Sequence, residues 1–428
     1  MKIELVGLNS IALTVMLLLA PAFPAAAQST SGPLPVSSQI TLEQAVRDSG
    51  AGPASARSLV HALAASVPQT RLTSSDAQQN DNFGFSVSLF GNRALIGASQ
   101  PLNNGPGAAY VFVFDGNTWI QEAKLVESDA VNGDGFGRSV SLSGNRALIG
   151  AWAKDPAGVA YIFELNGATW AQTAELTAPD SSPLYFGLSV SLSGSRALVG
   201  GPGKGAAYVF DFDGSSWIQT AKLTPSVSSD VFGDAVSLSG DRALVGAWDQ
   251  NDNAGAAYVF AFDGTTWNQE GELIPLDPLH NARFGMSVSI SGKRALVGAL
   301  GYEINREPIG SAYVFAFDGS TWSQEAQLAP SDGNSYGEFG LAVSISGKRA
   351  VVTAGEDATG NTGVAYVFVL SRTGWSEHKA LTPSDRFGYT FGDSVSASGP
   401  RVLVGAPGAN GAYVFGKCTA AVPAVDFD

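Results

Sequence analysis

Residues capable of acid–base or nucleophilic chemistry are few in this sequence and lie far apart. The three histidines are His61, His280 and His378, and the single cysteine is Cys418. No His-Glu-x-x-His, Gly-x-Ser-x-Gly, Cys-x-x-Cys or phosphate-loop pattern occurs. A lone cysteine cannot form an intramolecular disulfide. The sequence therefore shows no assembled catalytic set.

Oxygen-bearing side chains alternate in one segment, which makes it the best candidate for a metal site. Asp249, Asn251 and Asn253 resemble the start of a calcium loop, but the glycine and the closing bidentate acid of such a loop are missing. A polar surface loop is the preferred interpretation, with these three residues kept as weak metal candidates. A second acidic set has the same weakness and comprises Asp76, Asp81, Asp129, Asn132 and Asp134.

Tryptophans fall into two groups. Most recur at one offset in a repeated unit, which favours packing between repeats over a sugar-stacking ladder. These are Trp119, Trp170, Trp217, Trp267, Trp322 and Trp375. Trp152 and Trp248 differ because each follows a Gly-Ala pair at the end of a predicted strand, so we interpret them as contact residues for a ligand.

The elements that position these residues come from an internal repeat. Phe-Gly-x-Ser/Ala-Val-Ser, a turn ending in arginine, an apolar strand ending in Gly-Ala and Ala-Tyr-Val-Phe recur seven times, 46 to 55 residues apart. The repeats open at Phe83, Phe136, Phe186, Phe232, Phe284, Phe339 and Phe391. Each unit contains four short strands bounded by Gly or Asn turns. The pattern predicts an all-β fold, a seven-bladed β-propeller of four-stranded antiparallel blades.

The two ends of the repeat region complement each other. The last unit stops after Tyr413-Val414-Phe415 without a Trp strand, whereas Arg71-Leu72 stands before Phe83 at the offset of a fourth strand. An N-terminal strand can therefore complete the last blade, which leaves no open sheet edge.

The repeated motif resembles the FG-GAP repeat of integrin α subunits and of many exported bacterial proteins. The resemblance covers about residues 69 to 416 and implies a propeller. In that family the turn between the first two strands often carries an oxygen-rich calcium loop, but here it reads Ser143-Gly144-Asn145-Arg146 in the second unit. The resemblance raises calcium as a ligand, yet the calcium loops of the family are absent, so no cofactor is expected.

Two fixed turns predict one face of the propeller. Phe-Asp-Gly-x-x-Trp resembles the Asp-box of sialidase propellers and predicts structural turns at Asp115, Asp213, Asp263 and Asp318. An arginine follows each motif phenylalanine by ten residues, and we expect these arginines to form a ring beside those hairpins with a structural role. They are Arg93, Arg146, Arg196, Arg242, Arg294, Arg349 and Arg401.

The other connections vary in length, which favours a ligand site on the opposite face. The glycine ending the second strand and the tyrosine of the third are 8 residues apart at Gly200 and Tyr208 but 15 apart at Gly298 and Tyr313. Loops can vary on one face without disturbing the strand ladders. The predicted ligand-binding residues there are Trp152, Trp248, Asp249, Asp252, Tyr302 and Glu303.

The N-terminus indicates export. Lys2, an apolar run from Ile11 to Ala20 and Ala25-Ala26-Ala27 fit a signal peptide over residues 1–27, too short and too interrupted by proline for a membrane span. Residues 28–68 form a linker in which 42–65 could be helical. The propeller is predicted over 69–417 and a C-terminal tail over 418–428.

The net charge of the chain limits the kinds of partner that it can bind. A net charge of −14 argues against nucleic acid and anionic membrane as partners, because both require clustered lysine and arginine. The favoured function is a non-enzymatic binding or adhesion module, secreted, periplasmic or at the cell surface, that contacts an extracellular protein or glycan. The alternative is a propeller enzyme of carbohydrate or polymer turnover, which would need convergent acids with perturbed pKa values in one cavity.

Overall fold

The computed structural model describes residues 68–76, 81–100, 105–178, 185–278, 280–301, 310–331, 338–355, 362–385 and 390–416. The predicted signal peptide, nearly all of the linker and the tail lie outside these residues. No helix in the described ranges is long and apolar enough to cross a membrane.

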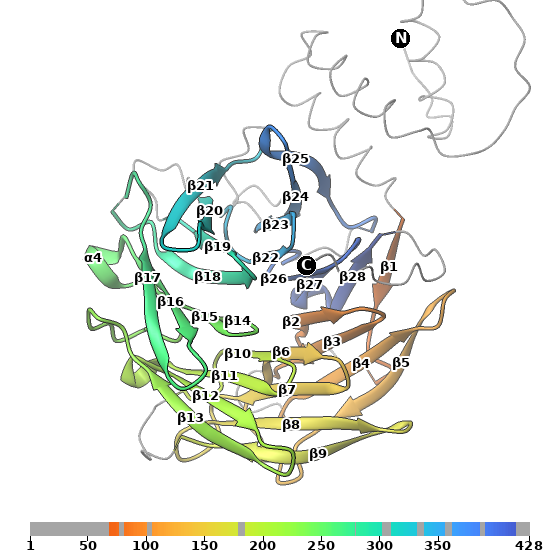
Figure 1. Cartoon of the computed structure of the whole chain (residues 1–428). Helices are drawn as coiled ribbons and strands as arrows, with labels where there is room; N and C mark the ends of the chain where they lie inside the picture. The colour runs from red at the N-terminus through yellow and green to blue at the C-terminus, as the bar shows by residue number, and fades with distance from the viewer. Residues whose placement is uncertain are drawn as a thin grey trace, which may run out of the picture. The chain divides into compact units, whose positions relative to one another are not determined.

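Seven four-stranded antiparallel sheets form the propeller, as the sequence predicts (Figure 1). The innermost strands are β2 (Phe83–Phe90), β6 (Phe136–Ser143), β10 (Val190–Ser193), β14 (Val236–Ser239), β18 (Phe284–Ser291), β22 (Val343–Ser346) and β26 (Ser394–Ser398). The second strands are β3 (Arg93–Ala98), β7 (Arg146–Ala151), β11 (Arg196–Gly201), β15 (Arg242–Ala247), β19 (Arg294–Ala299), β23 (Arg349–Ala354) and β27 (Arg401–Ala406).

The outer half of each blade carries the aromatic motifs. The third strands are β4 (Ala108–Phe114), β8 (Val159–Asn166), β12 (Ala206–Phe212), β16 (Ala256–Phe262), β20 (Ser311–Phe317), β24 (Val364–Ser371) and β28 (Gly411–Phe415). The fourth strands are β5 (Trp119–Leu125), β9 (Thr169–Leu176), β13 (Trp217–Leu223), β17 (Trp267–Leu273), β21 (Trp322–Leu328) and β25 (Gly374–Leu381). The described connections add the short helices η1 (Pro202–Lys204), α4 (Gln250–Asn253) and η2 (Pro407–Ala409).

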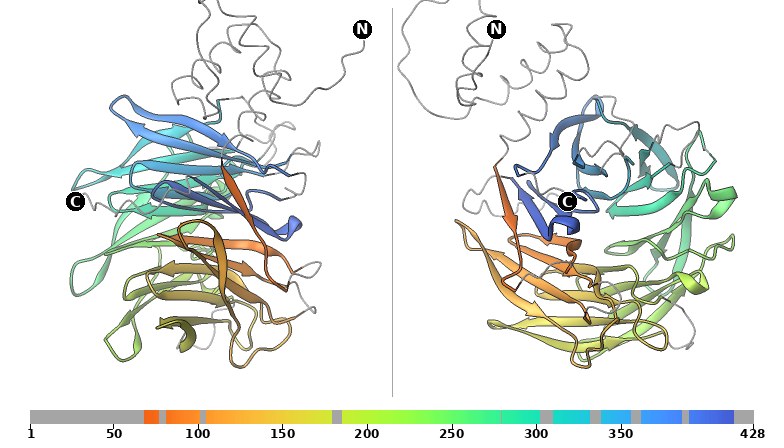
Figure 2. Two further views of the ribbon diagram at one scale, coloured as in Figure 1. Left: turned by 90° about the vertical axis from the view of Figure 1, so that its right-hand side faces the viewer. Right: turned by 180° about the vertical axis from the view of Figure 1, so that it is seen from behind.

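The N-terminal strand closes the last blade, which confirms the prediction. β1 (Gln69–Leu72) pairs antiparallel with β28, and the sheet runs β1-β28-β27-β26 (Figure 2). Arg71 Nη2 also donates to the carbonyl of Ala409 at 2.7 Å. The first and last parts of the propeller are thus joined by main-chain hydrogen bonds that cover the outer edge of β28.

The apolar core lies between neighbouring sheets. One cluster, for example, joins Leu95 and Val111 of the first blade to Phe136, Ile149 and Tyr161 of the second. Each motif phenylalanine is buried and meets the tyrosine and phenylalanine of the third strand with ring centroids 5.4 to 6.2 Å apart. Such tilted and edge-on contacts are the favoured geometry for buried aromatic pairs.

Serine hydroxyls link the innermost strands of neighbouring blades. Ser189 Oγ donates to the carbonyl of Gly233 at 2.7 Å, and Ser191 Oγ accepts the main-chain N–H of Leu238 at 2.9 Å. Gly200 lies beside this link, where a Cβ atom would stand 1.9 Å from the oxygen of Gly233. The alternating serines that the sequence indicates therefore supply hydrogen bonds as well as small size.

The sixth blade makes the same link with exchanged residues. Ala342 replaces the serine, Thr353 replaces the glycine of the second strand, and Thr353 Oγ1 donates to the carbonyl of Gly392 at 2.7 Å. The Thr353 side chain is fully buried. The hydroxyl group has moved from the first strand to the second, and the carbonyl of the next blade keeps its donor.

This exchange generates a prediction. Thr353→Gly should destabilise the protein by roughly 1 to 3 kcal/mol, because a buried carbonyl loses its donor and a strand gains a glycine. Adding Ala342→Ser should recover at least about 0.5 kcal/mol beyond the sum of the single effects. Urea unfolding of the two single variants and the double variant measures this coupling. Additive effects would show that the hydroxyl link contributes nothing.

Candidate functional site

The seven arginines lie beside the hairpins that join third and fourth strands, as predicted. Arg146, Arg196, Arg242 and Arg401 stack on an aromatic ring of the following blade, with the guanidinium carbon 4.4 to 4.9 Å from the centroid of Phe212, Phe262, Phe317 and Phe114 respectively. Arg349 donates to Pro400 O at 3.1 Å. A cation held on an aromatic face stabilises contact between blades. We call this side of the propeller the hairpin face.

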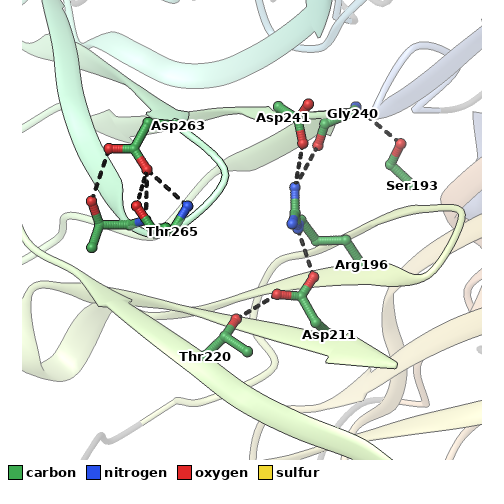
Figure 3. A network of polar contacts seen from close by, with 9 residues as sticks. Ser193, Arg196, Asp211, Thr220, Gly240, Asp241, Asp263 and Thr265 are labelled. Atoms are coloured by element: carbon green, nitrogen blue, oxygen red, sulfur yellow. Dashed lines mark hydrogen bonds and ion pairs between the residues drawn. The ribbon is translucent and has the colours of Figure 1, made fainter. Parts of the chain in front are cut away.

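Carboxylates on the strands pair with most of these arginines. Glu122 accepts from Arg93 at 3.0 Å and from the indole of Trp170 in the next blade at 2.9 Å. In the third blade the acid sits on the third strand instead, where Asp211 accepts from Arg196 at 2.6 Å (Figure 3). Arg196 also reaches Asp241 of the next blade at 2.8 Å. Five of the seven arginines thus have a carboxylate partner within the fold.

The aspartates of the Asp-box-like turns accept hydrogen bonds from residues of their own hairpins. Asp263 accepts the main-chain N–H groups of Thr265 and Thr266, each at 2.8 Å (Figure 3). The equivalent bonds from Thr118 and Asn117 hold the pKa of Asp115 below its usual range. The turns are structural, as predicted, although the arginines pair with strand carboxylates and not with these aspartates.

The second and fourth connections build a cavity of about 300 Å³ on the opposite side, which we call the loop face. Its lining residues come from the first two blades and from the loop between them. They are Asn82, Phe85, Ser99, Gln100, Gly133, Gly135, Arg138 and Trp152. This volume lies at the lower end of the range for small-molecule sites.

Trp152, a predicted ligand-binding residue, lies in this cavity wall and is half-buried. Its ring lies 5.4 Å from that of the exposed Tyr185. A Cβ atom on Gly135 would stand 2.5 Å from Trp152 Nε1, and Gly135 has a φ of +70°. Only glycine permits both this backbone conformation and the approach of the indole. The pair forms an aromatic platform beside the cavity.

Trp248 is held by a buried acid. Its Nε1 donates to Asp234 Oδ2 at 2.8 Å, and Arg283 lies over its ring with the guanidinium carbon 5.3 Å from the centroid. Burial raises the pKa of Asp234, against the lowering effects of the indole hydrogen bond and of the Arg138 charge. Trp248 is therefore anchored by the fold, with its ring partly exposed.

The predicted metal candidates lie on and around α4. Asp249 accepts a hydrogen bond from Ser229 at 2.5 Å, while Asn251, Asp252 and Asn253 are exposed and have positive φ. Within the described ranges, no cluster of three or more His, Cys, Asp and Glu side chains could hold a metal ion. Tyr302 and Glu303, the remaining predicted ligand-binding residues, lie outside the described residues.

Two members of the second acidic set, Asp129 and Asp134, converge on a lysine that sequence reasoning overlooked, whereas Asp76 pairs with Lys124 and Asp81 accepts from Gln100. Lys154 Nζ lies 2.9 Å from Asp134, 3.1 Å from Asp129 and 3.8 Å from Glu127. Tyr161 donates to Asp129 at 3.0 Å. The negative charge of the loop ahead of the second Phe-Gly pair is thus partly offset by one ammonium group of its own chain.

The most informative residues that sequence reasoning missed are Phe85, Arg138 and Asp234. Each is the third residue of its Phe-Gly-x-Ser/Ala motif. The guanidinium carbon of Arg138 lies 4.3 Å from the ring centroid of Phe85. The signal was available, because this position varies among apolar, acidic and basic residues while its neighbours are fixed.

Glu127 yields a prediction about pH. Burial raises the pKa of Glu127 to about 8, so the native state keeps a proton that the unfolded chain releases near its usual 4.5. Stability should therefore fall as pH rises through this window. Glu127→Gln should raise the melting temperature by roughly a few degrees at pH 9 and change it little at pH 5. The exposed Glu175→Gln is the control, and equal shifts at both pH values would contradict the assignment.

Comparisons with known proteins agree with this architecture. A family model described as FG-GAP repeat matches residues 67–112, 119–163, 170–210, 217–260, 267–315 and 322–368. No curated protein sequence matches the chain.

Two solved structures are similar to this chain at low sequence identity, and only the first has a TM-score above 0.5. The β-propeller domain of Cps50 (Swd1) from Myceliophteria thermophila is 12% identical with a TM-score of 0.53, covering 82% of this chain and 100% of that one. The computationally designed Ika8 protein is also 12% identical, with a TM-score of 0.49 over 80% of this chain and 98% of that one. At this identity the likeness concerns the fold alone. With seven repeats in register and the family model matching most of the propeller, the chain belongs to the FG-GAP repeat family.

Proposed function

We propose that this protein is an exported binding or adhesion module that presents its loop face to an extracellular protein or glycan. The observation that carries the proposal is the contrast between the two faces. On the hairpin face, five of the seven arginines pair with acids, as Arg242 and Glu270 do at 2.8 Å, and the other two donate to backbone carbonyls. The hairpin face also has a cavity, but that cavity lies among turns of fixed length, whereas the loop-face cavity with its aromatic wall lies among connections of variable length.

The distribution of acids supports binding over catalysis. Asp129 and Asp134 pair with Lys154, Asp234 accepts from Trp248, and Asp249 accepts from Ser229. Each of these carboxylates is held by a partner from the fold. A hydrolytic enzyme of the kind considered above would instead aim a pair of acids into one cavity.

Export is part of the proposal and rests on the N-terminal sequence. Expression of the full chain in a secretion-competent host should yield a protein that begins at Gln28, because Ala25-Ala26-Ala27 offers the small residues that signal peptidase needs. Mass spectrometry of the N-terminal peptide measures this. If the protein stays in the cytoplasm and keeps residues 1–27, the export part of the proposal is wrong.

The loop face is tested with an aromatic pair. Trp152→Ala together with Tyr185→Ala should weaken ligand binding at least about tenfold, because exposed aromatic side chains dominate such contacts. Phe90→Ala is the matched control, since Phe90 is an exposed aromatic residue lining a cavity on the hairpin face. A glycan and protein array probed with the mature protein and both variants gives the result. Binding lost only with Phe90→Ala would place the ligand on the hairpin face.

A further inference from the structure

Arg138 is a cation whose hydrogen-bonding capacity the fold leaves unused. It stands at the start of β6, half-buried in the wall of the loop-face cavity. Its guanidinium carbon lies over the ring of Phe85, 4.3 Å from the centroid, which is a cation–π contact. Within the described part of the chain, no oxygen accepts a hydrogen bond from it and no carboxylate forms an ion pair with it. An arginine carries five N–H donors, and leaving buried donors unpaired costs free energy.

The acids near the cavity already have other partners. Asp81 accepts from Gln100 Nε2 at 2.8 Å, Asp134 lies 2.9 Å from Lys154 Nζ, and Asp234 accepts from Trp248. The attraction between Arg138 and Asp234 acts through space, without a hydrogen bond between them. A carboxylate brought in by a ligand would therefore meet an arginine that does not have to break an existing pair.

The rest of the lining indicates what carries that carboxylate. Asn82, Ser99 and Gln100 place amide and hydroxyl groups around the cavity, and Trp152 adds an aromatic surface. Hydroxyl groups of a sugar ring can pair with such side chains, while the apolar side of the ring packs on an indole. An acidic peptide side chain would use Arg138 but would make little use of the polar groups of Asn82 and Ser99. The volume of about 300 Å³ suits a single ring.

We propose that the loop-face cavity binds one unit of an acidic saccharide, a hexuronate, with its carboxylate on Arg138 and its ring against Trp152. This inference rests on the proposed binding function and names its ligand class. Phe85 orients the planar guanidinium, which can hold a carboxylate through two parallel hydrogen bonds. The net charge of −14 repels an anion at long range, but charges more than about 8 Å away are largely screened at physiological ionic strength.

Calorimetric titration of the mature protein tests the proposal. The probes are short oligomers of glucuronate, galacturonate and mannuronate, their carboxyl-reduced neutral counterparts, and a glutamate oligopeptide of equal charge. At least one uronate should bind at least tenfold more tightly than its neutral counterpart and than the peptide. Arg138→Gln should lower that affinity at least tenfold, and Arg138→Lys should restore only part of it, because lysine lacks the planar fork.

Arg372→Gln is the matched control, since it removes the same charge from an exposed turn between β24 and β25. Its affinity should equal that of the unaltered protein, and thermal unfolding of each variant checks the fold. Equal binding of neutral sugars, tighter binding of the peptide, unchanged affinity in Arg138→Gln, or no uronate binding would each overturn the proposal. Binding of another ligand that needs Trp152 and Tyr185 but not Arg138 would leave the proposed function standing and remove this inference alone.

Discussion

Hydroxyl groups hold the innermost strands together where sheet pairing is unavailable. Each sheet of the described residues consists of the four strands of one blade, so the innermost strands of neighbouring blades are not paired as strands of one sheet. Ser191 and its equivalents provide it by accepting an N–H from the next blade, and Ser189 provides it by donating to a glycine carbonyl. Gly200 lets the strands approach closely enough. These bonds join innermost strands that come from different sheets.

The two faces of the propeller follow from this arrangement and differ in their chemistry. On the hairpin face, short fixed turns bring arginines, acids and indoles of adjacent blades together, as at Arg93, Glu122 and Trp170. Charges paired there have little capacity left for a ligand. On the loop face, connections of different length leave a cavity lined by Arg138, whose guanidinium has no hydrogen-bond acceptor among the described residues. Membership of the family accounts for the propeller fold. The candidate site arises where the loops differ in length and sequence from one repeat to the next.

Lysines of this chain form ion pairs with acidic residues of its loops. Lys154 of the second blade lies among Asp129, Asp134 and Glu127. Lys124 of the first blade pairs in the same way with Asp76. An ammonium group compensates buried carboxylate charge without requiring the six to eight oxygen ligands of calcium. The loops therefore stabilise the blade ends through the tyrosines of the third strands, such as Tyr161. This arrangement is consistent with a propeller whose repeats lack the calcium loops of the family.

The sequence alone determined the seven blades, their four strands and the closure by residues 69–72, because a period of about 50 residues and strand alternation are local properties. The sequence also predicted Trp152 as a ligand-contact residue, and the structure places Trp152 in the wall of the loop-face cavity. The sequence could not identify Arg138 as an unpaired cation, or Lys154 as the partner of Asp129 and Asp134, because those contacts join loops of different length across blades. Only the packing of the sheets decides which charges meet, since pairing depends on distance in space and not on offset in the repeat.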